Sequence, residues 1–347
     1  MKIYRVSIIG LGRMGSTIDD EVVGSRAVPV PYSIAAAATA GTRFELAAGC
    51  DLIADRREAF RERWGVTALY SDYHDMIEKE TPDLVAICTR ADTHSQIAVD
   101  VARAGVPMLY LEKSIACSPR ENDAVLEACR VHGTIFNSGV LNRFNNRYMV
   151  VRELIRSGRI GVPQAAVHFG GRSLLHGHIH TIDTLSYLLG DPPIEAVRGE
   201  LIPRDLEIVE NRLEADPKAL FELRFDGGLK AWTVPAGKID YEVLGTQGSI
   251  RSLNNSVAMQ LRTEGPPDGR HIIWQDTELP AVEPESSVMT CLEDLINANE
   301  CGRPTRGPIE LAHHITEACF AVAESHRRDG AWVDLPLDER DLYIFHV

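Results

Sequence analysis

The segment IYRVSIIGLGRMG, residues 3–15, indicates the fold class of this 347-residue chain. Residues 3–9 are mostly β-branched or aliphatic, as in a buried strand, and they lead directly into the glycine-rich turn GLGRMG, residues 10–15. In such a turn the first glycine permits a tight bend, the second lets the backbone approach a pyrophosphate, and the third lets a helix pack closely on the strand. The residues that follow are compatible with a helix, whose N-terminal amides would favour phosphate. The sequence therefore predicts a dinucleotide-binding turn formed by Gly10, Gly12, Arg13, Met14 and Gly15.

Further apolar runs follow this turn at residues 44–50, 82–88 and 106–112, separated by stretches of helical character such as residues 93–105. Strands that alternate with helices are typical of a parallel sheet covered on both faces. We therefore expect an N-terminal Rossmann domain of the doubly wound α/β class at residues 1–138, and we expect it to bind NAD.

After about residue 140 the pattern changes. Residues 220–234, 240–253 and 257–263 show partial alternation of apolar and polar side chains, with glycine-rich turns between them. This pattern is typical of an antiparallel sheet. Residues 139–347 are therefore predicted to form an α+β domain with a large, open, mostly antiparallel sheet, which serves substrate binding and oligomerisation.

The composition excludes several classes of partner. Apolar residues make up 44% and charged residues 25%, and the formal net charge of −14 would repel nucleic acids and anionic membrane surfaces. No apolar run reaches the roughly 20 residues of a membrane-spanning helix. The seven cysteines are scattered without a C-x-x-C pair, and the N-terminus lacks the features of a secretory signal. We expect a cytoplasmic protein with reduced thiols.

Asp51 follows the second predicted strand, where a carboxylate can accept hydrogen bonds from the ribose hydroxyls of a dinucleotide. A 2′-phosphate would face this carboxylate, and the neighbouring Leu52 and Ile53 carry no positive charge, so Asp51 favours NAD over NADP. Alternatively, Asp51 only ends the strand. Asp51 follows Gly10 at about twice the usual spacing of about 20 residues. We attribute the excess to an insertion at residues 19–33, which would break the first helix and lie over the cofactor or a partner subunit, or merely elaborate the surface.

Several segments together, in the same order, resemble the Gfo/Idh/MocA family of nicotinamide-dependent sugar and polyol oxidoreductases. The resemblance covers nearly the whole chain. Its segments are GLGRMG with Asp51, CTRADTH (88–94), LEKS (111–114), HIHTIDTLSYLLG (178–190) and EVLGTQGSI (242–250).

The resemblance implies a role for Lys113 at the nicotinamide, where the lysine would shuttle the proton of the substrate hydroxyl, and for His180 beside it. It also implies cofactor contacts from Thr89, Arg90, His94, Glu112 and Lys113. A lysine after a buried parallel strand lies where doubly wound folds bind ligands. Partial burial and the positive nicotinamide would both lower its pKa toward a range useful for acid–base catalysis. The alternative is that Lys113 has no catalytic role and is a solvated residue at the strand end, paired with Glu112.

Two residues depart from the family pattern near Lys113. The family signature Glu-Lys-Pro, often with a cis peptide, here ends in Ser114, which would free the local backbone. Arg90 replaces the proline of the family's Thr-Pro-Asn loop and would add a cation near the cofactor.

His176 stands where the family usually has an aspartate, and His178 replaces a small residue. We expect His176 and His180 to contact the substrate and act with Lys113, and we add His178 and Asp183 as substrate-binding candidates. Three alternating histidines also fit a metal site if the segment is extended. A helix beginning near His178 would turn residues two apart away from each other, so we predict no metal.

Three cations, Arg143, Arg172 and Lys238, are candidates for binding an acidic substituent of the substrate, such as that of a uronate or sulfo-sugar. Ordinary surface cations are an equally good explanation for them.

The sequence thus predicts an NAD-dependent dehydrogenase of a secondary hydroxyl on a sugar or polyol, assembled as a homodimer or homotetramer through the second-domain sheet. One alternative is an NAD-dependent glycosidase that oxidises its substrate transiently, eliminates the aglycone, adds water and reduces the product again. Another is a sensor that binds nucleotide without turnover.

Overall fold

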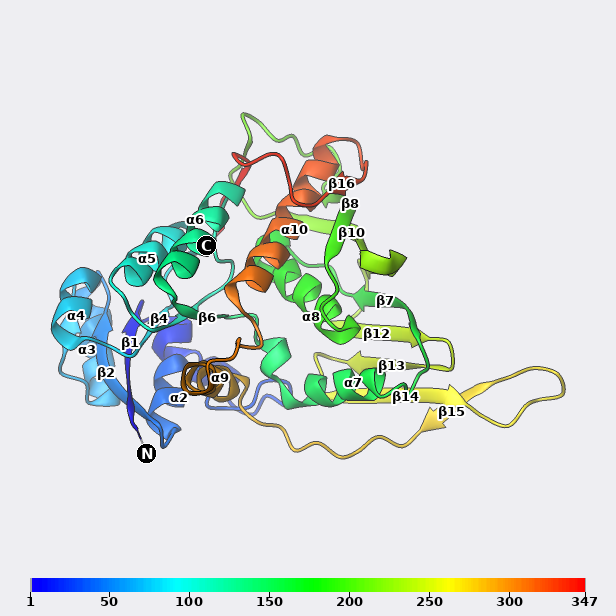
Figure 1. Cartoon of the computed structure of the whole chain (residues 1–347), viewed down its shortest axis with the longest axis horizontal. Coiled ribbons are helices and arrows are strands. Elements are labelled where there is room, and N and C mark those ends of the chain that lie inside the picture. The colour runs from blue at the N-terminus through cyan, green and yellow to red at the C-terminus, as the bar shows by residue number, and fades with distance from the viewer. Residues whose placement is uncertain (1, 347) are drawn as a thin grey trace. The chain divides into compact units, whose positions relative to one another are not determined.

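The chain passes between two units, each with its own core, in the computed structural model, which describes residues 2–346 (Figure 1). The first unit consists of the residues up to Phe144, the segment Glu285–His313 and His346. The second consists of Asn145–Pro284 and His314–Phe345. The predicted division at residues 138 and 139 treats each domain as one continuous segment, whereas the structure returns a later segment to the first unit. Among the described residues, no helix has both the length and the apolar character needed to span a bilayer.

A six-stranded parallel sheet forms the centre of the first unit. Its strands, in spatial order, are β3 (Leu69–Tyr70), β2 (Phe44–Cys50), β1 (Tyr4–Ile9), β4 (Leu84–Ile87), β5 (Met108–Leu111) and β6 (Ile135–Ser138). The strand order reverses between β1 and β4, which is the doubly wound arrangement with its ligand site at the reversal. The predicted parallel α/β sheet is confirmed.

Helices cover both faces of this sheet and create two cores. In β5, Leu109 and Leu111 belong to the core that includes side chains of α5 and α6, whereas Met108 and Tyr110 belong to the core that includes α2 and α9. Alternate residues of a strand point to opposite faces, so a strand buried on both sides must be apolar throughout. The helices are η1 (Arg13–Thr17), α1 (Asp19–Val22), α2 (Ile34–Ala40), α3 (Ala54–Trp64), α4 (Tyr73–Glu80), α5 (Ala91–Arg103), α6 (Pro119–His132), η2 (Leu141–Phe144) and α9 (Ser287–Cys301).

The inserted segment breaks the first helix, as predicted. Between α1 and α2 the chain runs through Gly24 and two prolines, Pro29 and Pro31, before the Ser33 hydroxyl caps α2 by accepting the Ala36 N–H at 3.1 Å. The Asp19 carboxylate accepts the backbone N–H groups of Tyr32 at 2.7 Å and Ser33 at 2.9 Å. One side chain thus joins the two ends of the insertion.

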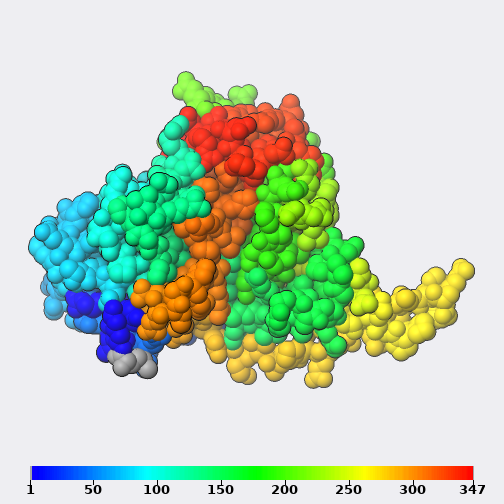
Figure 2. All heavy atoms as spheres, in the orientation of Figure 1, coloured from blue at the N-terminus to red at the C-terminus, as the bar shows by residue number. Residues whose placement is uncertain are grey.

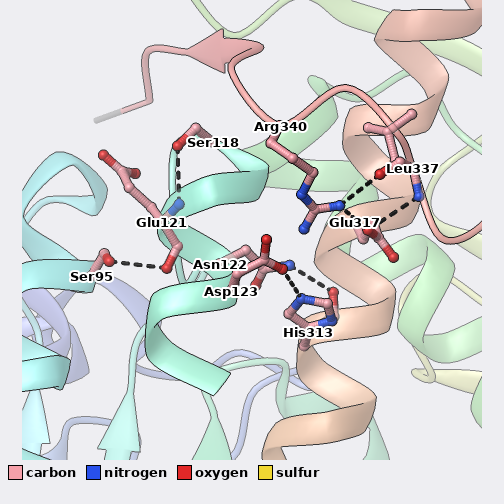
Figure 3. Close-up of polar contacts among 9 residues, drawn as sticks. All are labelled: Ser95, Ser118, Glu121, Asn122, Asp123, His313, Glu317, Leu337 and Arg340. Carbon is pink, nitrogen blue, oxygen red and sulfur yellow. Dashed lines mark hydrogen bonds and ion pairs between the residues drawn. The ribbon is translucent and has the colours of Figure 1, made fainter. Parts of the chain in front are cut away.

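Capping by Ser118 explains where α6 begins, and other side chains of this helix contact His313 (Figure 3). The Ser118 hydroxyl accepts the Glu121 N–H at 3.2 Å, and Pro119 occupies the first turn. From the same helix, Asn122 donates to the carbonyl of His313 at 2.9 Å, and Asp123 lies 2.8 Å from the ring of His313. The returning segment of the first unit is therefore held to α6 by polar contacts.

The second unit contains a nine-stranded sheet in which only the β7–β11 pair is parallel among the described strands. Its strands, in spatial order, are β15 (Trp274–Thr277), β14 (Ala258–Glu264), β13 (Gly248–Leu253), β12 (Asp240–Gly245), β7 (Pro163–Phe169), β11 (Lys230–Val234), β10 (Lys218–Phe225), β8 (Ile194–Ile202) and β16 (Val333–Asp334). The predicted large, mostly antiparallel sheet is confirmed. Figure 2 shows the tip of the β14–β15 hairpin, in yellow, projecting from the rest of this unit.

One face of this sheet is covered by α8 (Ile179–Leu189), which packs on β7 and β12, beside α7 (Asn146–Arg156). On α10 (Ile309–Arg327), Glu317 is 2% exposed and accepts hydrogen bonds from Arg340 at 2.5 Å and from the Leu337 N–H at 3.2 Å (Figure 3). The chain near the C-terminus is thereby held on α10. A small parallel pair, β9 (Arg212–Leu213) and β17 (Tyr343–Ile344), completes this unit.

Candidate active site

The glycine turn is fixed by two contacts that only glycine permits. Gly10 has φ +92°, and a Cβ there would lie 2.7 Å from the carbonyl group of Cys88, at the end of β4. A Cβ on Gly15 would lie 2.0 Å from the carbonyl oxygen of Gly10. At Gly12, by contrast, a Cβ would meet only the guanidinium of Arg56, at 3.9 Å. The outer side of the turn is therefore open, which fits the approach of a pyrophosphate.

Asp51 connects this turn to the end of β2. Its carboxylate is 8% exposed and accepts the Leu11 N–H and the Ile53 N–H, each at 2.9 Å. A carboxylate has about four acceptor positions, so it still has capacity for ribose hydroxyls. The guanidinium of Arg56, on α3, lies 3.6 Å from the same carboxylate. The sequence interpretation missed this cation because it considered only Leu52 and Ile53, whereas the helix brings Arg56 back over the strand end.

The segment from the end of β4 into the first turn of α5 carries three of the predicted cofactor residues. Thr89 accepts a hydrogen bond from the Thr93 hydroxyl at 2.9 Å, and the exposed Arg90 forms an ion pair with Asp92 at 2.9 Å. His94 is 1% exposed, with its two ring nitrogens 3.0 Å from the Thr89 carbonyl and 2.7 Å from the Ser114 carbonyl. Burial lowers the pKa of His94. The ring of His94 thus links this loop to the segment after β5, and its direct contact with a cofactor stays a prediction.

Lys113 is the second residue after β5, following Glu112, and is half-buried. Its backbone N–H donates to a carboxylate oxygen of Glu112 at 3.2 Å. Burial raises the pKa of Glu112, against the opposing charge of Lys113. The peptide bond between Lys113 and Ser114 is cis.

The three alternating histidines of the second unit have three different environments. The segment Leu174–His178 forms a π-helical turn, η3, that continues into α8. His176 is exposed, His178 is 0% exposed and His180 is half-buried. Because the segment is helical, residues two apart diverge. Within residues 2–346, no group of three metal-binding side chains is brought together.

His178 is fully buried, which does not support its predicted substrate contact. Its Nε2 lies 3.0 Å from the Ala219 carbonyl and its Nδ1 lies 3.2 Å from the Thr181 hydroxyl. A neutral ring satisfies both contacts if Nε2–H donates and Nδ1 accepts. Burial, together with the charge of Arg172, lowers the pKa of His178 to about 4, so the ring is neutral at pH 7.

The cations and the acid proposed for substrate binding also differ in exposure. Arg143 is 1% exposed and donates to the Arg306 carbonyl at 2.9 Å, and Asp183 is 2% exposed on α8. Burial of this extent does not support the predicted substrate contacts of Arg143 and Asp183. Arg172 is half-buried and Lys238 is exposed.

Asp216 was missed by the sequence interpretation. Its carboxylate accepts the Leu175 N–H at 2.8 Å and the His176 N–H at 2.7 Å, and therefore holds the start of the histidine segment. Burial raises the pKa of Asp216, opposed by these hydrogen bonds. The only sequence signal was an acidic residue in a loop, and its partner lies 40 residues away.

The Asp51→Asn variant tests the cofactor assignment. Without the carboxylate charge, Arg56 is unopposed and attracts a 2′-phosphate, so we expect the ratio of NADP affinity to NAD affinity to rise about tenfold, or about 1.4 kcal/mol. Dissociation constants from fluorescence titration measure it. The control is Asp55→Asn, which removes an exposed carboxylate from α3, the helix that carries Arg56. An unchanged ratio for Asp51→Asn would contradict the assignment.

Comparisons with known proteins agree with this geometry. Residues 4–140 match the oxidoreductase family described as an NAD-binding Rossmann fold, and residues 153–335 match the C-terminal alpha/beta domain of the same family. A myo-inositol 2-dehydrogenase of Thermotoga maritima is 25% identical over 266 residues, which cover 71% of this chain and 74% of that protein. The scyllo-inositol 2-dehydrogenase (NAD(+)) of Bacillus subtilis is 27% identical over 266 residues, covering 71% of this chain and 72% of that protein.

Among solved structures, a levoglucosan dehydrogenase in complex with NADH and levoglucosan superposes with a TM-score of 0.75, covering 96% of this chain and 100% of that one. At 17% identity this likeness concerns the fold alone. The two family descriptions, in contrast, match most of the chain in the expected order. The chain therefore belongs to the Gfo/Idh/MocA oxidoreductase family, and its first unit is an NAD-binding Rossmann domain.

Proposed function

We propose that the chain is an NAD-dependent dehydrogenase that oxidises a secondary hydroxyl of a sugar, a polyol or a close derivative. The place of Lys113 carries the proposal. It is half-buried two residues after the end of β5, and β5 is the neighbour of β4, whose end contacts the glycine turn. Ligands of doubly wound sheets bind outside the carboxyl ends of the strands at this reversal. The inositol dehydrogenases among the relatives support a substrate with several hydroxyls.

In this proposal the amine of Lys113 takes the hydroxyl proton while the neighbouring carbon loses a hydride. NAD, when bound, supplies the hydride acceptor. A lysine does this work when it is within hydrogen-bond reach of the hydroxyl and deprotonated near the working pH. His180 and His176, half-buried and exposed respectively, are proposed to hold the substrate oxygens. Arg172 and Lys238 are the remaining candidates for an acidic substituent.

One assay tests the reaction class. Purified protein with NAD receives a panel of free polyols, sugars, uronates and aryl glycosides, and both NADH absorbance and aglycone release are followed. We expect NADH to accumulate on one or more free polyols or sugars, because Lys113 and a bound nicotinamide suffice for net oxidation. Lys113→Ala should lower kcat by at least about 100-fold while leaving NAD affinity unchanged. The control is Lys79→Ala, which removes an exposed cation from α4.

The other outcomes identify the alternatives. Aglycone release that requires NAD but leaves no net NADH would replace the dehydrogenase with the glycosidase. NAD binding without either signal on any substrate would favour a sensor. Oxidation of uronates alone would support the roles of Arg172 and Lys238, whereas oxidation of neutral polyols alone would remove them.

We also propose that the sheet of the second unit joins two copies of the chain through its open face, meaning the face opposite α8. Apolar side chains on neighbouring strands of this face are only half-buried. They are Ala165, Val167, Trp232, Val234 and Leu244, with Trp232 opposite Val167 and Leu244 opposite Ala165. A contiguous apolar surface of this kind marks an interface. The same face also carries side chains of both charges, such as the ion pair of Arg251 with Asp240 at 2.9 Å. A surface with both charges can be complementary to an identical copy of itself, as a two-fold symmetric dimer requires.

The Trp232→Lys variant tests this interface. A charge at the centre of the apolar surface would be desolvated in the assembly, so we expect the variant to be monomeric while the wild type is a dimer or tetramer. Light scattering coupled to size exclusion measures the mass. The control is Gln164→Lys, at an exposed position on β7. A monomeric wild type, or a Trp232→Lys variant with unchanged mass, would contradict the proposal.

A further inference from the structure

The hydroxyl of Tyr110 is hydrogen-bonded to the carboxylate beside the proposed acid–base lysine. Tyr110 is 0% exposed on β5, and its hydroxyl donates to Oε1 of Glu112. The other oxygen, Oε2, accepts the backbone N–H of Lys113 at 3.2 Å. Residues two apart on a strand point to the same face, which allows Tyr110 and Glu112 to meet. Glu112 thus connects a buried tyrosine to the backbone that carries the lysine.

The carboxylate of Glu112 is confined on its other sides. It is 7% exposed, and its backbone N–H donates to the Ile87 carbonyl at 2.9 Å, in continuation of the sheet. A Cβ added to Gly139 would lie 2.7 Å from Oε1 of Glu112, so the backbone after β6 approaches the carboxylate as closely as glycine allows. The hydrogen bond from Tyr110 therefore acts on a group with little freedom to find another partner.

Titratable or charged groups from several elements surround Glu112. These groups are Tyr110 and Lys113 on its own segment, Arg13 at the glycine turn, Tyr32 before α2, Cys88 after β4 and Cys291 on α9. Only Arg13 and Lys113 among them are cations. Burial raises the pKa of Glu112, while the charge of Lys113 and the Tyr110 hydrogen bond oppose this rise. Burial and the Glu112 charge raise the pKa of Tyr32 to about 12.

A tyrosine of the same core could serve only to fill space, since Tyr110 packs in an apolar cluster with Met108 and Leu84. Phenylalanine would fill nearly the same volume. The hydroxyl instead adds a charge-assisted hydrogen bond to a buried carboxylate, which is about twice as strong as a neutral one. The hydroxyl, rather than the ring, is therefore the feature that needs an explanation.

We propose that Tyr110 is a positioning residue for the acid–base step: through Glu112 it fixes the backbone at Lys113 and keeps a negative charge beside its ammonium group. This inference rests on the proposed function, in which Lys113 takes the proton of the substrate hydroxyl. Tyr110 itself touches neither substrate nor cofactor. Its effect reaches the reaction only through the carboxylate.

The Tyr110→Phe variant removes the hydroxyl and keeps the ring. We expect kcat to fall about tenfold, with KM and NAD affinity unchanged, because ground-state binding does not depend on how the amine is held. Glu112→Gln should also lower kcat. The double variant should be no slower than Glu112→Gln alone, because both changes act through one contact. The control is Tyr73→Phe, which removes a tyrosine–carboxylate hydrogen bond of 2.9 Å to Asp100 elsewhere in the unit.

The pH profile gives a second readout, one that a purely structural role would not move. When Lys113 acts as a base, kcat/KM for oxidation rises with pH as the ammonium loses its proton. Removing the adjacent negative charge in Glu112→Gln makes that loss easier, so the rising limb should move to lower pH by about one unit. Far-UV circular dichroism reports whether each variant is folded.

Three results would overturn the inference. They are wild-type kcat in Tyr110→Phe, additive losses in the double variant, and an unshifted limb in Glu112→Gln. If Tyr110→Phe no longer binds NAD, the pH profile of Glu112→Gln alone determines whether the inference stands. Normal turnover in Lys113→Ala would sink the proposed function as a whole, whereas a dead Lys113→Ala with a normal Tyr110→Phe would remove only this inference.

Discussion

The contact between the glycine turn and the end of β4 is the constraint on which the nucleotide-binding unit depends. Gly10 lies so close to the Cys88 carbonyl that a side chain there would overlap the backbone. Because β1 and β4 are neighbours at the reversal of strand order, this contact sets the turn against the loop that carries Thr89 and His94. His94 in turn lies against the Ser114 carbonyl. The position of Lys113 thus follows from the close approach of two backbones.

Carboxylates in buried or half-buried positions make the other structural connections. Asp51 holds Leu11 and Ile53, Glu112 holds Tyr110 and the Lys113 backbone, and in the second unit Asp216 holds the start of η3. Each removes a charge from water, which is unfavourable unless hydrogen bonds replace the lost hydration. Because their partners include backbone N–H groups, these acids fix the loops themselves.

The sequence predicted the features that depend on local pattern. The glycine turn, the alternation of strands and helices, and the break of the first helix at residues 19–33 depend on short-range spacing, and the structure has all three. It did not predict how distant residues meet. Arg56 reaches Asp51 because α3 folds back over the end of β2, and the ring of His178, in η3, contacts the carbonyl of Ala219 on β10, 41 residues away. Periodicity places a side chain on a face, but the partner across that face comes from tertiary packing.

The central claim is that the amine of Lys113 transfers the proton, and chemical rescue measures this most directly. The Lys113→Ala variant, saturated with NAD and substrate, is supplied with small alkylamines while NADH formation is followed. If the missing amine is the only defect, the rate should rise in proportion to amine concentration and depend on the basicity of the amine. Turnover without added amine at the wild-type rate, or an inactive variant that no amine restores while NAD still binds, would contradict the account.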